Sequence, residues 1–107
     1  MRLIKAINAK RFKLNDLRRK KVNHCFLCET HEDVVDFLTK LIAVGYTKWF
    51  TSVDININEP ASPSYNKDRH VPICYFVHYD GLSYSYNINN YKYTKWSTDM
   101  IIEGGVK

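Results

Sequence analysis

Glycine, cysteine and long apolar runs are all scarce in this 107-residue sequence. The four glycines, at Gly45, Gly81, Gly104 and Gly105, cannot form a glycine-rich phosphate loop or a dinucleotide fingerprint. The longest uncharged apolar stretch, Leu41 to Tyr46, is far shorter than the roughly 20 residues of a membrane helix. The H-E-x-x-H and G-x-S-x-G motifs are also absent. We therefore expect no membrane partner, and no motif indicates an enzyme.

The cysteines are odd in number, so Cys25, Cys28 and Cys74 cannot all pair in disulfides within one chain. An odd count fits a reducing compartment better than a disulfide scaffold. Near the N-terminus, Lys5 and Asn8 interrupt the apolar stretch that a secretory signal requires. We therefore expect a cytoplasmic protein, and the length and ordinary composition predict a single domain over residues 1–107.

Positive charge is concentrated at the N-terminus. Residues 1–21 hold nine basic side chains and the single acid Asp16, a balance of +8, whereas the whole chain carries only +5. This asymmetry favours contact with something anionic, either nucleic acid or an acidic patch on a protein. A solvated face that serves solubility explains the same pattern. The candidate binding residues are Lys10, Arg11, Lys13, Arg18, Arg19, Lys20 and Lys21.

The stretch from Val22 to Gly45 carries the strongest secondary-structure pattern, while residues 2–21 fit a helix and a strand equally well. Alternation predicts a strand from Val22 to Cys28. Thr30 is a good N-cap for a helix from His31 to Val44, and Gly45 is the expected stop. Acidic side chains in the first turns suit the helix dipole, so they have a structural explanation. The core-facing positions of this helix are Val34, Phe37, Leu38, Leu41 and Ile42.

A hairpin is predicted in the second half of the chain. Ile73 to Tyr79 and Leu82 to Ile88 are rich in β-formers and flank Asp80-Gly81, which suits a type I′ turn. Counting outward from that turn pairs Tyr79 with Leu82, Val77 with Tyr84 and Tyr75 with Tyr86. The aromatic face should pack on the helix, and the opposite face should meet solvent or a partner; it carries Cys74, Phe76, His78, Ser83, Ser85 and Asn87.

Two further strands are expected, one through Val53, Ile55 and Ile57 and one from Tyr91 to Trp96. The region around Pro60, Pro63 and Asn66 has the composition of a polar loop. These elements predict an α+β fold with one principal helix packed on a small antiparallel sheet that contains the DG-turn hairpin.

A zinc site is the sharpest metal hypothesis. Histidines flank a C-x-x-C pair in the run from His24 to His31, and Cys74 with His70 and His78 could add ligands. However, two residues three apart on a strand point to opposite faces. Cys74 and a histidine also lack a third group to orient them for catalysis. The residues therefore predict ordinary buried cysteines, with no metal, no cofactor and no catalytic residue.

Aromatic residues alternate with lysine in Tyr46-Thr47-Lys48-Trp49 and again in Tyr93-Thr94-Lys95-Trp96. Such patches can stack nucleic-acid bases. Tyrosine and tryptophan also cover the edges of small cores, and this structural role is the one that the composition favours.

The run from Val22 to Trp49, followed by a tyrosine-rich hairpin, resembles short accessory proteins of bacteriophages and mobile elements. The residues that carry this resemblance are the Thr30-capped helix with Phe37-Leu38-Thr39-Lys40-Leu41, then Gly45-Tyr46 and Trp49. The resemblance implies a host-interacting binding protein that inhibits or redirects a host defence or nucleic-acid-handling protein in the host cytoplasm. No functional residue carries over from it. Direct DNA or RNA binding by the basic N-terminal segment is the alternative, and a small zinc protein is the third.

Overall fold

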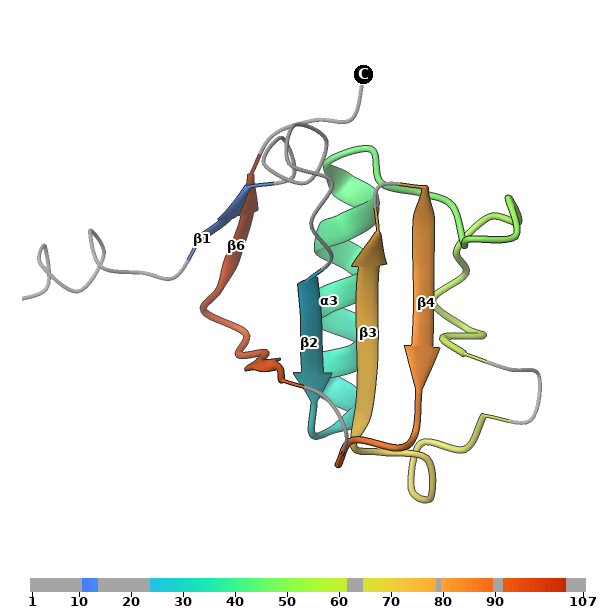
Figure 1. Ribbon diagram of the computed structural model, residues 1–107, viewed down its shortest axis with the longest axis vertical. Helices are drawn as coiled ribbons and strands as arrows, with labels where there is room; N and C mark the ends of the chain where they lie inside the picture. Colours follow the sequence, from blue (N-terminus) through green and yellow to red (C-terminus); the bar gives the residue numbers. More distant parts are fainter. Residues whose placement is uncertain (1–10, 14–23, 62–64, 79, 90–91, 104–107) are drawn as a thin grey trace, which may run out of the picture.

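The computed structural model describes residues 11–13, 24–61, 65–78, 80–89 and 92–103. Over these residues the chain forms one helix, α3 (His31–Ala43), packed on one face of a four-stranded sheet (Figure 1). The strands lie in the order β4-β3-β2-β5, and their bounds are His24–Cys28 for β2, Ile73–His78 for β3, Gly81–Ser85 for β4 and Thr94–Lys95 for β5. A separate parallel ladder joins β1 (Arg11–Lys13) to β6 (Ile101–Glu103).

The α+β class is confirmed, but the sheet is mixed. β3 runs antiparallel to both β2 and β4, whereas β5 runs parallel to β2. The sequence pattern reports which side chains alternate, not the direction of a strand, so it could not reveal this reversal. Within the described residues, no helix has the length and apolar character that crossing a membrane requires.

The helix begins and ends where its capping residues place it. Thr30 is extended at φ −131°, and its Oγ1 accepts from the Asp33 backbone N–H at 3.2 Å. At the other end, Val44 caps the helix and Gly45 adopts a left-handed φ of +92°. Both predicted boundaries are confirmed to within one residue.

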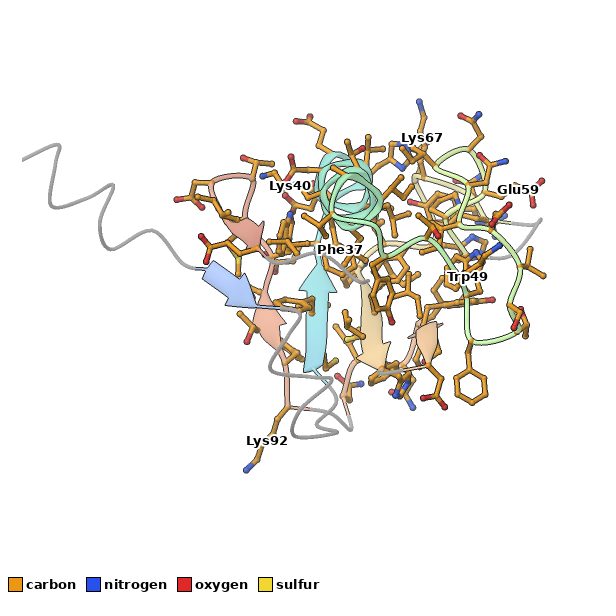
Figure 2. All side chains as sticks on the ribbon, turned by 90° about the horizontal axis from the view of Figure 1, so that it is seen from above. Phe37, Lys40, Trp49, Glu59, Lys67 and Lys92 are labelled. Carbon is orange, nitrogen blue, oxygen red and sulfur yellow. The ribbon has the colours of Figure 1, made fainter. Side chains whose placement is uncertain are left out.

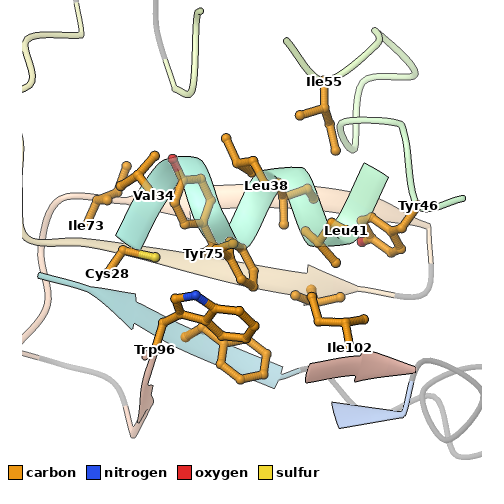
Figure 3. Packing of buried hydrophobic residues seen from close by; sticks show 14 of the residues in the cluster. Cys28, Val34, Leu38, Leu41, Tyr46, Ile55, Ile73, Tyr75, Trp96 and Ile102 are labelled. Atoms are coloured by element: carbon orange, nitrogen blue, oxygen red, sulfur yellow. The ribbon is translucent and has the colours of Figure 1, made fainter. Parts of the chain in front are cut away.

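The core lies between α3 and the facing side of the sheet (Figure 3). Phe37 is fully buried, with its ring 5.4 Å from that of Phe26 on β2 and 5.3 Å from that of Tyr75 on β3. Trp96, directly after β5, closes one side and lies 5.0 Å from Phe37. Its indole Nε1 donates to Asp36 Oδ2 at 2.9 Å, so this buried polar group is satisfied.

Lys40 ties the C-terminal segment to the helix. Its Nζ donates to the backbone carbonyls of Thr98 at 2.8 Å and Met100 at 2.9 Å, and it also forms an ion pair with Asp36. These contacts place Met100 and Ile102 against the core, where both are buried. One lysine therefore holds together segments that are about 60 residues apart in the chain.

The predicted hairpin register is wrong by two residues. Val77 pairs with Leu82, Tyr75 with Tyr84 and His78 with Gly81, so the turn lies between His78 and Gly81. Because the shift is an even number, each side chain keeps its face. Tyr75, Val77 and Leu82 are buried against the helix side as predicted. The predicted pairing of Tyr79 concerns a residue outside the described set.

The register prediction failed because Gly81 was assigned to the turn. In the structure Gly81 belongs to β4, and it is a glycine because another backbone segment packs directly against it. Its φ is +146°, and a Cβ atom placed on it would lie 2.7 Å from the backbone of Trp49 and Phe50. Only glycine lets another backbone come this close at the start of a strand. The segment that packs there is the loop after α3.

The two other predicted strands are mostly absent from the described residues. Val53 to Ile57 contributes only isolated bridges, and strand structure within the predicted 91–96 segment is limited to β5. Residues 47–55 instead form a tight loop in which Lys48 faces Asp54 and Ser52 turns the chain at a left-handed φ of +73°. Hydrogen bonds between Trp49 and the backbone of Ser52 and Val53 close this turn.

Candidate functional site

A groove of about 450 Å³ lies between the outer edge of β4 and the loop over residues 49–61. It lies across the sheet from β1 and β6, and Figure 2 shows Trp49 and Glu59 on this loop beyond β4. The volume is within the range of ligand-binding clefts. Residues that line it include Trp49, Phe50, Val53, Glu59, Leu82 and Tyr84.

The near wall is fixed by backbone hydrogen bonds to the start of β4. Leu82 donates its N–H to the Lys48 carbonyl at 3.1 Å, and the Phe50 N–H donates to the Leu82 carbonyl at 2.9 Å. Trp49 thereby lies parallel to Leu82 at the sheet edge. The close approach permitted by Gly81 is what allows this docking.

The far wall is anchored by one buried side chain. The Tyr75 hydroxyl donates to the Pro60 carbonyl at 2.6 Å, and both residues are fully buried. Nearby, the Glu59 N–H donates to the Asn56 carbonyl at 2.9 Å and closes a turn. Burial raises the pKa of Tyr75 above its ordinary value, so the donor stays protonated. Both walls of the groove are thus built from satisfied hydrogen bonds.

Aromatic and apolar side chains dominate the groove surface. The Trp49 ring meets the Tyr84 ring edge-to-face, with centroids 6.0 Å apart. Phe50 and Val53 stand at the tip of the 47–55 loop with exposed fractions of 58% and 61%. Exposed apolar side chains next to a formed cleft are typical of an interaction surface.

The charges around the groove are mainly acidic. Lys48 forms an ion pair with Asp54, so these two charges offset each other. Glu59 is exposed and adds a further carboxylate. The three charged groups together give the groove a net charge of −1.

No family model, curated protein or solved structure matches the chain.

Of the binding residues predicted from the sequence, the structure describes only Arg11 and Lys13. Arg11 and Lys13 belong to β1, where they pair with Ile101 and Glu103 of β6. The other candidates lie outside the described residues: Lys10, Arg18, Arg19, Lys20 and Lys21. The basic N-terminal segment thus stays a prediction.

The cysteines occupy different environments, as strand alternation predicts. Cys28 belongs to the buried cluster beneath α3, whereas Cys25 lies on the opposite side of β2, near Cys74 of β3. Burial, together with the neighbouring Cys74 thiol, raises the pKa of Cys25 to about 12, and burial raises those of Cys28 and Cys74 as well. Reactive thiols need the opposite shift, so these groups are poor nucleophiles.

Three of the four histidines in the zinc hypothesis, His31, His70 and His78, have other partners. His31 Nδ1 lies 3.0 Å from the Tyr65 hydroxyl, and His78 Nε2 lies 2.9 Å from Ser83 Oγ. His70 Nδ1 accepts the backbone N–H of Asn66 at 2.7 Å. In the described part of the chain, no three His, Cys, Asp or Glu side chains come close enough to share a metal ion.

In both tyrosine-to-tryptophan motifs the tryptophan contacts the core, as the structural interpretation predicted, although Tyr93 of the second motif is exposed. Trp96 is buried in the core, while Trp49 is only partly buried and lines the groove. Tyr46 is buried, and its hydroxyl donates to the His78 carbonyl at 2.7 Å. The sequence thus contained the groove residue Trp49 but gave no means of distinguishing it from Trp96.

Proposed function

We propose that this chain is a small non-catalytic binding protein that engages a partner protein through the groove beside β4. The observation that carries this proposal is the exposure of Phe50 and Val53 beside a cleft whose two walls are held by hydrogen bonds. Apolar side chains at that exposure contribute little to the core and lose contact with water when a partner covers them.

The chemistry of the groove favours a protein over nucleic acid. Phosphates are bound by lysine, arginine and backbone N–H groups, whereas this groove has two carboxylates and one lysine that is already paired. A cleft lined mainly by aromatic and apolar side chains is better matched to the side chains of a protein. We assign the groove no catalytic role.

The proposed partner is a host protein of defence or nucleic-acid handling, met in the host cytoplasm by an accessory protein of a bacteriophage or mobile element. Support comes from the resemblance of the 22–49 region and from the charge asymmetry of the chain. The groove would contact the partner protein, and the basic N-terminal segment would contact an acidic patch or bound nucleic acid.

A second candidate function is direct DNA or RNA binding, favoured by the +8 balance of residues 1–21. It would use Lys10, Arg11, Lys13 and Arg18 to Lys21, and not the groove. With about six phosphate contacts, affinity would fall on the order of a thousandfold between 50 and 200 mM salt.

Capture from a bacterial lysate, with and without nuclease, separates these functions when matched variants are compared. We expect a nuclease-resistant partner that is lost with the double variant Phe50→Ser and Val53→Ser. Tyr93→Ser, which removes an aromatic side chain of 40% exposure outside the groove lining, should retain it. Capture that ends with nuclease or with Arg18→Gln, while the groove variant binds normally, would favour the second function.

A further inference from the structure

The outer edge of β4 is paired at Leu82 but, among the described residues, not at Tyr84, the next residue whose peptide groups face outward. Leu82 directs both its N–H and its carbonyl outward, where Lys48 and Phe50 bind them. Residues two apart on a strand direct their peptide groups to the same edge, so Tyr84 also faces outward. No described residue donates to or accepts from the backbone of Tyr84 at that edge. Among the described residues, the groove therefore contains a strand edge that is unpaired at Tyr84.

The open edge lies beside an aromatic ring and an uncompensated carboxylate. Trp49 packs edge-to-face on Tyr84, and Glu59 also lines the groove, without a described ion-pair partner. A cation placed between them gains both attraction to the indole ring and attraction to the carboxylate. Lysine and arginine are the side chains that supply this charge on a flexible apolar stem.

We propose that this groove binds an extended, basic segment of a partner protein, which adds to the sheet as a strand beside Tyr84. The segment's backbone pairs with the free peptide groups of Tyr84, and a lysine or arginine lies between Trp49 and Glu59. The apolar residues of the segment that flank this lysine or arginine cover Phe50 and Val53. This mode is β-strand addition, in which the backbone gives affinity and the pockets give sequence preference. The inference rests on the proposed function and specifies the chemistry of the partner.

The test uses the full chain, labelled with ¹⁵N, and the peptide acetyl-Thr-Val-Lys-Val-Arg-Val-Thr-amide as the probe. We expect millimolar or tighter binding, with amide shifts concentrated at Trp49 and Leu82 to Tyr84. A peptide with glutamates in place of Lys and Arg should bind at least about tenfold more weakly, a difference of about 1.4 kcal/mol. A version with alternate N-methylated peptide groups should lose binding, because it cannot pair along the strand edge.

Glu59→Lys supplies the matched protein variant and should weaken the basic peptide by about tenfold. Asp68→Lys reverses an exposed charge outside the groove lining and should leave the affinity unchanged. Absence of binding at millimolar peptide, equal binding of the acidic or N-methylated peptide, or no response at Tyr84 would overturn strand addition. So would protection of Tyr84 by a second copy of the chain, measured by sedimentation and amide exchange.

These outcomes are distinguishable from failure of the proposed function. If lysate capture still depends on Phe50 and Val53 while the peptide results fail, the groove binds its partner by another mode. If capture does not depend on those side chains, the proposed function itself is wrong.

Discussion

Gly81→Ala tests whether the groove depends on close backbone approach. An alanine Cβ would lie 2.7 Å from the Phe50 nitrogen and from the Trp49 carbonyl carbon and oxygen, all of them backbone atoms. Neither segment can move aside by a simple side-chain rotation. Alanine is also strained at a φ of +146°. Strain and overpacking each cost about 1 to 3 kcal/mol, so we expect a total loss of about 2 to 6 kcal/mol.

Gly45→Ala is the matched control. Gly45 also has a positive φ, +92°, but it is exposed, whereas Gly81 is buried. Its substitution should therefore cost only the conformational strain, about 1 to 2 kcal/mol. Urea unfolding followed by tryptophan fluorescence gives both free energies, and amide spectra of the folded variants report on the Phe50 to Leu82 hydrogen bond. Equal losses for the two variants would refute the steric argument.

Three further predictions concern stability. Lys40→Met should lower the free energy of unfolding by about 1 to 3 kcal/mol, because it removes hydrogen bonds that hold the C-terminal segment, and urea denaturation measures the loss. Ser52→Gly should raise the free energy of unfolding by up to about 1 kcal/mol, since glycine accepts the +73° φ without strain. The urea midpoint should rise with it, and a lower midpoint would contradict this prediction. Stability should fall as pH rises above about 9 toward 12, because unfolded thiols ionise there while Cys25 and Cys28 stay protonated in the fold. A flat alkaline stability profile, or rapid labelling of either thiol in the native protein, would contradict the last prediction.

The local signals of the sequence were sufficient for the helix and for part of the hairpin. Thr30 and Gly45 act within a few residues of where they stand, so capping chemistry alone located both ends of α3. The period of two in β3 and β4 likewise placed Tyr75, Val77 and Leu82 on the buried face. It was wrong for Cys74, which is fully buried on the face predicted to meet solvent or a partner, and for Tyr86, which is 38% exposed.

Features that depend on distant segments could not be predicted in this way. Gly81 carries the composition signal of a tight turn, but its glycine is required by Trp49 and Phe50, which approach from another part of the chain. The parallel pairing of β5 with β2 and the hydrogen bond from Lys40 to the Met100 carbonyl also join segments that are far apart in the sequence. The groove itself joins β4 to the 49–61 loop, so no single stretch of sequence contained it.

Amide hydrogen exchange of the full chain, alone and with its captured partner, tests whether the groove beside β4 is the binding site. If it is, the partner should slow exchange at Tyr84 and across Trp49 to Val53, by at least about tenfold where a strand edge becomes paired. Slower exchange confined to residues 10–21, with the edge of β4 unchanged, would contradict it and assign binding to the basic segment.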